Sequence, residues 1–233
     1  MNGSVQVAMD TGVGLKGGEF IVDVVFPLYG DAIPADHGYQ LFSAISHEAP
    51  ELHSDPSVGV HPIRGRLIGQ RMLALTRESR LIVRLPVSRI REVLRLAGKQ
   101  LDLGGGKVMV GAPDTRPLRP APQLHSRLVV IKGFTEPAGF LDAVQRQLAE
   151  RGVAGEAQLV VRRSRLPMEG GRGSSEPYLR RTLRIHDREI VGYAVRVAGL
   201  APEDSLRLQA VGLGGRRRFG CGIFIPAAEE RPA

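Results

Sequence analysis

Three histidines that lie close together in the sequence are suited to proton-transfer chemistry. His47, His53 and His61 fall within 15 residues. Imidazole titrates near neutral pH, so a histidine can take a proton from one reacting group and deliver one to another. A loop histidine is more often structural, and a charged His47 would also be stabilised at the C-terminal end of the helix predicted before it. All three are therefore candidates for general acid–base catalysis.

A second candidate is the glycine-rich stretch of residues 212–224, which contains three consecutive arginines. Glycine allows close backbone approach and positive φ angles, and successive N–H groups in such a loop can form an anion-binding concavity. Guanidinium groups match phosphate oxygens in geometry and charge. The pattern predicts that a phosphate-rich partner is contacted by Gly212, Gly214, Gly215, Arg216, Arg217 and Arg218. The alternative is a glycine-rich turn with a solvated basic surface.

The composition indicates an aliphatic core and a basic C-terminal half. The chain has 233 residues and a net charge of +8, with 42% hydrophobic but only 5% aromatic residues. Base stacking on aromatic side chains is therefore not the main mode of any nucleic-acid contact. Residues 127–226 hold 17 basic and 10 acidic side chains, a net charge of +7. This concentration of charge fits a surface that faces a polyanion.

Cysteine content and hydropathy exclude several classes of protein. The single cysteine, Cys221, excludes an internal disulfide and a thiolate-rich metal site, and we interpret it as a small filler residue. No apolar run reaches the roughly 18 residues of a membrane-spanning helix, and no basic-then-apolar signal begins the chain. We therefore expect a cytoplasmic protein without a membrane partner.

The histidines belong to a predicted α+β unit at residues 19–112. Asp36 is predicted to be the N-cap of the helix that ends at His47, and the other two histidines fall in the segment that follows this helix. Proline and glycine mark the remaining boundaries. The unit is predicted to contain strands at 20–26, 63–69, 71–76 and 80–85, a loop at 54–62, helices at 37–47 and 87–97, and a hairpin at 101–110.

A second unit of similar order is predicted at residues 127–226, after a proline-containing linker at 113–126. It is predicted to contain strands at 127–132, 157–163, 178–185, 189–197 and 222–226, and helices at 137–151 and 202–211. Each unit follows the βαββαβ order of a ferredoxin-like (RRM-like) domain. The predicted fold is α+β, with two tandem ferredoxin-like domains whose uncovered sheet faces form a cleft. Residues 1–18 are predicted to be a flexible arm and residues 227–233 a tail.

Several runs resemble a known family. The run Gly212-Leu-Gly-Gly-Arg-Arg-Arg-Phe-Gly-Cys-Gly-Ile-Phe224 is similar to the C-terminal glycine-rich loop of the RAMP superfamily. The runs Phe26-Pro-Leu-Tyr-Gly-Asp and Asp36-His-Gly-Tyr-Gln-Leu-Phe-Ser-Ala-Ile-Ser46 resemble one branch of it, the CRISPR repeat-processing endoribonucleases, and among these the myxan subtype. Further similar runs begin at Gly59, Ser79 and Ser205. The resemblance covers nearly the whole chain from about residue 20.

The resemblance implies metal-independent cleavage of CRISPR precursor RNA within its repeats, with no cofactor. In that family a 2′-hydroxyl attacks the adjacent phosphorus, which leaves a 2′,3′-cyclic phosphate and a 5′-hydroxyl. The family places its acid–base histidine just after the first helix, where His53 matches best, His61 is second and His47 third. The first unit has no lysine in the matching loop, so Arg64 or Arg66 is expected to stabilise the phosphorane charge.

The same resemblance implies that basic side chains of both units hold the repeat RNA. Arginines flank the Gly/Ser-rich loop at 166–177 and are predicted to form a basic hairpin that enters an RNA groove. Tyr39, near the start of the first helix, is a candidate for a phosphate hydrogen bond. The predicted RNA-binding residues outside the glycine-rich stretch are Tyr39, Arg64, Arg162, Arg163, Arg165, Arg180 and Arg181.

Two other functions compete with this interpretation. A non-catalytic RAMP subunit, bound to RNA and to other subunits of a CRISPR effector complex, would have the same loop and the same charge. A nucleotide-binding enzyme that uses residues 212–222 as a phosphate loop is disfavoured, because no Lys-Ser/Thr pair follows the glycines and the loop precedes a strand.

Overall fold

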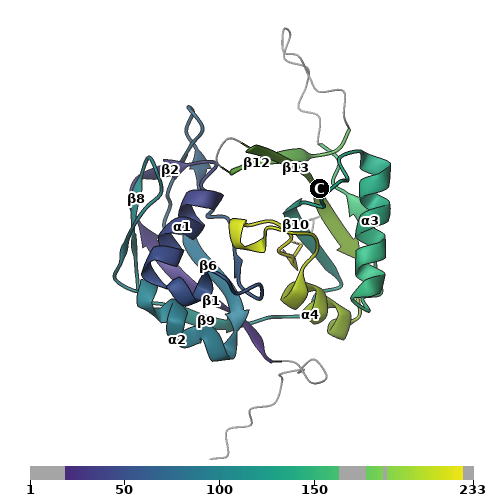
Figure 1. Ribbon diagram of the computed structural model, residues 1–233, viewed down its shortest axis with the longest axis horizontal. Coiled ribbons are helices and arrows are strands. Elements are labelled where there is room, and N and C mark those ends of the chain that lie inside the picture. Colours follow the sequence, from purple (N-terminus) through teal and green to yellow (C-terminus); the bar gives the residue numbers. More distant parts are fainter. Residues whose placement is uncertain (1–18, 163–176, 186–187, 228–233) are drawn as a thin grey trace, which may run out of the picture.

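A computed structural model describes residues 19–162, 177–185 and 188–227. Two antiparallel sheets lie in the two halves of the chain, and each half also contains helices (Figure 1). The first sheet has the order β3-β6-β1-β8-β7, with β9 also paired to β1. Its strands are β1 (Ile21–Tyr29), β3 (Gly59–Val60), β6 (Arg80–Pro86), β7 (Gln100–Asp102), β8 (Lys107–Val110) and β9 (Asp114–Pro117).

The second sheet has the order β11-β13-β10-β14, with β12 paired to β13. Its strands are β10 (Gln123–Val129), β11 (Glu156–Leu159), β12 (Arg180–Ile185), β13 (Arg188–Ala198) and β14 (Ile225–Pro226). The main helices are α1 (Gly38–Glu48) and α2 (Ile90–Val93) in the first half, and α3 (Pro137–Glu150) and α4 (Pro202–Val211) in the second. In the first half β1 lies between β6 on one side and β8 and β9 on the other, and in the second half β10 lies between β13 and β14. In each half the first strand of the βαββαβ unit is thus placed between the third and the fourth. The predicted tandem ferredoxin-like fold is confirmed.

Alternation along β1 separates the helix-covered face of the first sheet from the face that meets the second half. Val24, Phe26 and Leu28 are buried in one hydrophobic cluster with residues of α1 and α2. Asp23 and Val25 project to the opposite face, because successive side chains of a strand alternate. A second cluster fills the other half, with Phe140 and Val144 of α3 packed on Tyr193 and Val195 of β13. Polar side chains of the first sheet are thereby directed between the halves.

A small third sheet projects from the first half. It has the order β2-β5-β4 and is formed by β2 (Ala32–Pro34), β4 (Arg66–Leu67) and β5 (Met72–Ala74). Pro34 pairs with Met72, which joins the β4–β5 hairpin to the segment just before α1. Among the described residues, no helix is long and apolar enough to cross a membrane.

Several predicted boundaries were wrong. The segment predicted as a linker contains β9 and the start of β10. All four residues of β9 are exposed, and main-chain pairing with β1 holds the strand, so it leaves no hydrophobic pattern in the sequence. The predicted loop at 54–62 contains β3, which pairs with β6 at its end. The predicted helix at 87–97 is α2 flanked by two 3₁₀ turns, Val87–Arg89 and Leu94–Leu96.

The predicted N-cap was also wrong. His37 occupies the N-cap of α1, and Asp36 instead accepts a hydrogen bond at Oδ2 from the backbone N–H of Arg184 in β12, at 3.1 Å. The carboxylate therefore connects the two halves of the chain, which no local pattern around α1 indicates.

Candidate active site and nucleic-acid interface

His53 is held against α1 by a short 3₁₀ turn, Pro50–Leu52, that follows the helix. Its ring stacks on Phe42 with centroids 5.8 Å apart and an interplanar angle of 21°. Nδ1 lies 3.2 Å from the hydroxyl oxygen of Ser46. The side chain is exposed, and Nε2 has no hydrogen-bond partner among the described residues. The imidazole is thus oriented from one side and open to a substrate from the other.

The glycine-rich stretch of the second half reaches across to this histidine. Figure 1 shows it, in yellow, extending from α4 to α1 through the 3₁₀ turn η4 (Arg217–Phe219). The guanidinium of Arg218 lies 5.3 Å from the centroid of the Phe42 ring and donates a hydrogen bond to the backbone carbonyl of His53. Phe219 meets the Phe42 ring edge-on at 5.5 Å. The surroundings of His53 are therefore built by both halves of the chain.

Tyr39 and His47 lie on α1 near the same site. Tyr39 is half-buried, and its ring centroid is 6.0 Å from that of Phe219. His47 is exposed in the last turn of the helix. Both side chains line a hollow of about 640 Å³ on the surface of α1.

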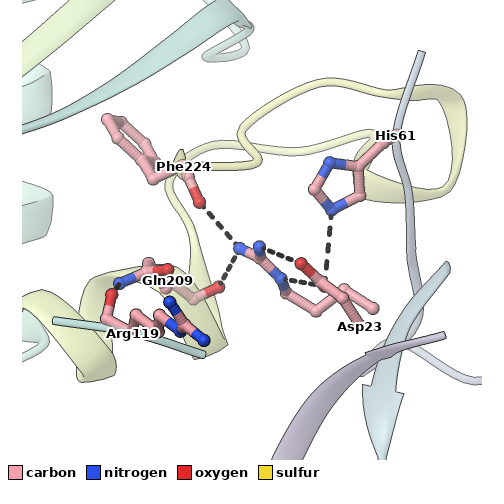
Figure 2. A network of polar contacts seen from close by, with 6 residues as sticks. Asp23, His61, Arg119, Gln209 and Phe224 are labelled. Atoms are coloured by element: carbon pink, nitrogen blue, oxygen red, sulfur yellow. Dashed lines mark hydrogen bonds and ion pairs between the residues drawn. The ribbon is translucent and has the colours of Figure 1, made fainter. Parts of the chain in front are cut away.

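His61 occupies a different environment, in a polar network between the two halves (Figure 2). Asp23 and Arg84 are directly paired across β1 and β6, and Arg84 donates to both carboxylate oxygens, from Nε at 2.7 Å and from Nη2 at 2.8 Å. Nε2 of His61 lies 3.6 Å from Oδ1 of Asp23, beyond hydrogen-bond distance. His61 is only 8% exposed, which distinguishes it from the open ring of His53.

Arg84 also connects this network to the second half. It is 1% exposed, and its Nη1 donates to the backbone carbonyls of Gln209 at 3.0 Å and Phe224 at 2.7 Å. Burial opposes ionisation of Asp23, but the hydrogen bonds from Arg84 outweigh it and hold the pKa of that carboxyl below its ordinary value. Burial lowers the pKa of His61, and the nearby Asp23 only partly offsets this. His61 is therefore neutral at pH 7 and lies next to the Asp23–Arg84 pair, whose arginine connects the two halves.

Comparison with known proteins identifies the family. A family profile described as "Cas6 Crispr" matches residues 22–229 of the chain. The curated relative "CRISPR-associated endonuclease Cas6" of Myxococcus xanthus (strain DK1622) is 37% identical over 205 residues, which is 88% of this chain and 81% of the relative. The chain belongs to the Cas6 family. The family that the N-terminal runs and the glycine-rich stretch indicated is confirmed.

Solved structures agree with the Cas6 fold. A protein titled "CRISPR associated protein Cas6" has a TM-score of 0.64 at 12% identity, with 89% of this chain and all of the other covered. A protein titled "An RAMP protein binding different RNA substrates" has a TM-score of 0.65 at 13% identity, with the same coverage. At such low identity the likeness shows the shared fold alone.

The cleft between the two sheets of this Cas6 chain is lined by more arginines than carboxylates, the latter being Asp23 and Glu78. A cavity of about 600 Å³ extends between the halves and is lined by Arg64, Arg80, His125 and Arg127, with His61 in its wall. Arg64 is exposed there and does not contact His53, and Arg66 lies on the exposed strand β4. The guanidinium that contacts His53 is instead that of Arg218. Stabilisation of the phosphorane charge by Arg64 or Arg66 stays a prediction.

The other predicted RNA-binding arginines are only partly described. Arg162 and Arg180 are exposed, and Arg181 is half-buried with its pKa lowered by burial and then by the charge of Arg127. Arg163 and Arg165 lie outside the described residues. RNA contact by these five side chains stays a prediction.

The glycines of the 212–224 stretch serve close packing rather than an open anion cradle. Gly212 and Gly214 have φ angles of 63° and 67°, and a Cβ atom on either would lie 2.2 Å from a backbone carbonyl oxygen. The N–H groups of Gly212, Gly214 and Gly215 donate to Leu208 O, Gln147 Oε1 and Val130 O. The predicted concavity is therefore wrong for these three N–H groups, because internal acceptors already use them.

The three arginines of the stretch take three different positions. Arg216 is exposed, with a φ of 68°. Arg217 turns inward, where Nη1 donates to the carbonyl of Val211 at 2.9 Å and burial lowers the pKa of its guanidinium to about 10. Arg218 packs on Phe42. Among the predicted RNA-binding residues of the stretch, Gly215 and Arg216 are exposed, and Arg217 and Arg218 are half-buried. Cys221 is fully buried, and burial raises the pKa of its thiol to about 12. The thiol is therefore protonated and unreactive at neutral pH, which agrees with its interpretation as a small filler residue.

Buried histidines predict that this protein loses stability in mild acid. His37 accepts the backbone N–H of Ile63 at Nε2 (2.9 Å) and donates from Nδ1 to Pro34 O (2.8 Å), which needs the neutral ring. Burial lowers the pKa values of His37, His61 and His125 from the ordinary 6.5. The unfolded chain thus binds more protons, so the free energy of unfolding should fall as pH drops below about 6.5. Urea midpoints at about pH 7.5 and 5 measure this.

A variant separates this effect from general charging of the surface. His37→Asn removes one titrating ring and should show a weaker pH dependence, even though it starts from a lower midpoint. Equal midpoints for the wild-type protein at the two pH values would contradict the prediction.

Proposed function

We propose that this Cas6 protein cleaves CRISPR precursor RNA within its repeats, without a metal ion. The 2′-hydroxyl on the 5′ side of the scissile bond attacks the phosphorus, and the products carry a 2′,3′-cyclic phosphate and a 5′-hydroxyl. Family membership and the named endonuclease from Myxococcus xanthus support the reaction class. The observation that carries the proposal is the exposed His53 imidazole, whose Nε2 is open while the backbone carbonyl of the same residue accepts a hydrogen bond from Arg218.

His53 transfers the proton and Arg218 stabilises charge in the proposed mechanism. Nε2 of His53 either accepts the proton of the 2′-hydroxyl or donates one to the leaving 5′-oxygen. The hydrogen bond between Nδ1 and Ser46 and the stacking on Phe42 keep the ring in one orientation. Arg218, which donates to the backbone carbonyl of His53 and packs on Phe42, is the cation proposed to stabilise the negative charge of the phosphorane. His61 is the weaker candidate for proton transfer, because it is buried with its Nε2 near Asp23.

The RNA strand is held along the basic surfaces on both sides of this site. Arg64 and Arg127 in the cleft, Arg216 beside the glycine-rich turn, and the arginines around β12 supply positive charge from both halves. Each phosphate that these side chains neutralise releases counterions, so RNA binding should weaken steeply with salt. The partner is therefore repeat RNA and the mature crRNA that remains after cleavage.

Incubation of repeat RNA with the purified protein in EDTA tests the proposal. We expect cleavage at one position, an upstream product whose 3′ end resists ligation until the cyclic phosphate is removed, and no cleavage of RNA with a 2′-deoxy group at that position. Tight repeat binding without any product would instead indicate a non-catalytic RNA-binding subunit of an effector complex. Cleavage that stops in EDTA would contradict the metal-independent mechanism.

A further inference from the structure

The β4–β5 hairpin of the first half ends in a turn of unusual composition. The N–H of Met72 donates to the carbonyl of Gly69 at 2.8 Å, and the two residues between them, Gln70 and Arg71, have φ angles of 43° and 57°. Two central residues with positive φ define a type I′ turn, which favours Asn-Gly at these positions. Gln and Arg both carry a Cβ atom that disfavours this region.

Nothing in the hairpin itself requires an arginine in this conformation. The carbonyl of Arg71 accepts the N–H of Ala35 at 2.7 Å, a bond that glycine would make equally well. The Arg71 side chain is exposed and has no hydrogen-bond or ion-pair partner among the described residues. Unfavourable backbone conformations of this kind persist where a function depends on them. The side chain of Arg71 is therefore the part of the turn that needs an explanation.

Arg71 lies where segments from both halves meet. It lines a hollow of about 420 Å³ together with Asp36, Tyr39 and Arg184. It also lines an adjoining smaller hollow with Arg127 and Gly220. Arg71, Arg127 and Arg184 come from the β4–β5 turn, β10 and β12, and none forms an ion pair with a carboxylate in the described part of the chain.

The charge around these hollows is unbalanced. Asp36 is the one carboxylate among their lining residues, and its Oδ2 already accepts the backbone N–H of Arg184. Three unpaired guanidinium groups around one carboxylate favour a bound anion. Tyr39 lies at the N-terminal end of α1, and its ring centroid is 6.0 Å from that of Phe219, whose ring meets that of Phe42 in the proposed active site.

We propose that the strained β4–β5 turn is retained because it places Arg71 in a phosphate subsite with Arg127 and Arg184, and that this subsite binds a phosphodiester of the RNA strand. The identity of the ligand as RNA rests on the proposed function. The subsite extends the basic track from the cleft between the sheets to the N-terminal end of α1.

Two substitutions in the same turn separate strain from binding. Arg71→Gly and Gln70→Gly each replace a residue of positive φ with glycine, but only the first removes a guanidinium. Arg71→Lys keeps the charge and the strain. Arg116→Ala removes an exposed arginine that pairs with Asp114 in β9 and lies outside the lining of these hollows. The measurements are the melting temperature and the affinity for a repeat RNA with a 2′-deoxy group at the cleavage position, over a range of salt concentrations.

Opposite effects on stability and binding are expected for Arg71→Gly. Its melting temperature should rise by about 2 °C, while the affinity for RNA falls about tenfold and the slope of log affinity against log salt becomes shallower by about 0.7. Gln70→Gly should show the same thermal gain with unchanged affinity and slope. Arg71→Lys should retain most of the affinity, and Arg116→Ala should keep both affinity and slope.

The proposal is overturned if Arg71→Gly keeps the wild-type affinity and salt slope, or if Arg116→Ala weakens binding as much. A lower melting temperature for both glycine variants would overturn the part that concerns strain. These readouts use RNA that cannot be cleaved, so they do not depend on the catalytic proposal. A wild-type protein that binds repeat RNA but never cuts it would defeat the proposed reaction and leave the subsite standing.

Discussion

Cleavage of repeat RNA should fall by about 10²- to 10⁴-fold when His53 is replaced by alanine, with little change in RNA affinity. The expected loss is large because the open Nε2 is the group proposed to move a proton in the rate-limiting step. Affinity should persist because the arginines proposed to contact RNA lie elsewhere on the surface. Single-turnover rates and equilibrium binding to a 2′-deoxy repeat measure the two quantities separately.

Two controls make this result specific to the imidazole. Free imidazole in the buffer should restore part of the activity of His53→Ala, because the side chain is exposed and the space it leaves is open to solvent. Ser46→Ala removes only the hydroxyl beside Nδ1 and should cost far less than loss of the ring. Full activity of His53→Ala would assign proton transfer to His47, the exposed histidine in the last turn of α1, and a His47→Ala variant would then show the loss.

Replacement of Arg84 by alanine should lower the free energy of unfolding by about 3–5 kcal/mol. The substitution leaves Asp23 buried beside β6 without its bidentate partner, and it removes the donor to the carbonyls of Gln209 and Phe224. These bonds link the first sheet to the second half. We therefore expect the two halves of the variant to unfold in separate steps during urea denaturation, where the wild-type chain unfolds in one.

An apolar double variant distinguishes the buried charge from the shape of the side chain. Asp23→Leu with Arg84→Met removes both charges while it retains volume, and it should be less destabilised than Arg84→Ala alone, because no unpaired carboxylate remains. A loss below about 1 kcal/mol for Arg84→Ala would match an exposed ion pair instead and would contradict the bracing role.

The tandem ferredoxin-like fold could be predicted from the sequence because its signals are local. The β-branched run around Val24 predicts a strand, and the spacing of Phe140, Val144 and Leu148 predicts one face of a helix. The repeated order of strands and helices then identifies the fold. The histidines after α1 were also visible, since their chemistry depends only on residue type and the family's motif position.

Sequence patterns failed where main-chain pairing or buried polar contacts determine the structure. β9 has no buried side chain, and its pairing with β1 leaves no periodicity. The N–H groups of the glycine-rich stretch were expected to be free, but acceptors far away in the sequence use them. Glycine is required at positions 212 and 214 because the backbone there packs closely against carbonyl oxygens. A phosphate-binding loop would show the same pattern of glycines, so the sequence alone does not distinguish the two.

The sequence by itself determined the two repeated units, the excess of positive charge in the second one and the set of histidines able to move a proton. Only the tertiary structure decided how their environments differ, because His61 is buried near Asp23 whereas His53 is exposed and its backbone carbonyl accepts a hydrogen bond from Arg218. His53 and Arg218 are 165 positions apart, and their contact depends on how two sheets pack. Local periodicity reports which face of an element is buried, but not which distant polar groups that burial brings together.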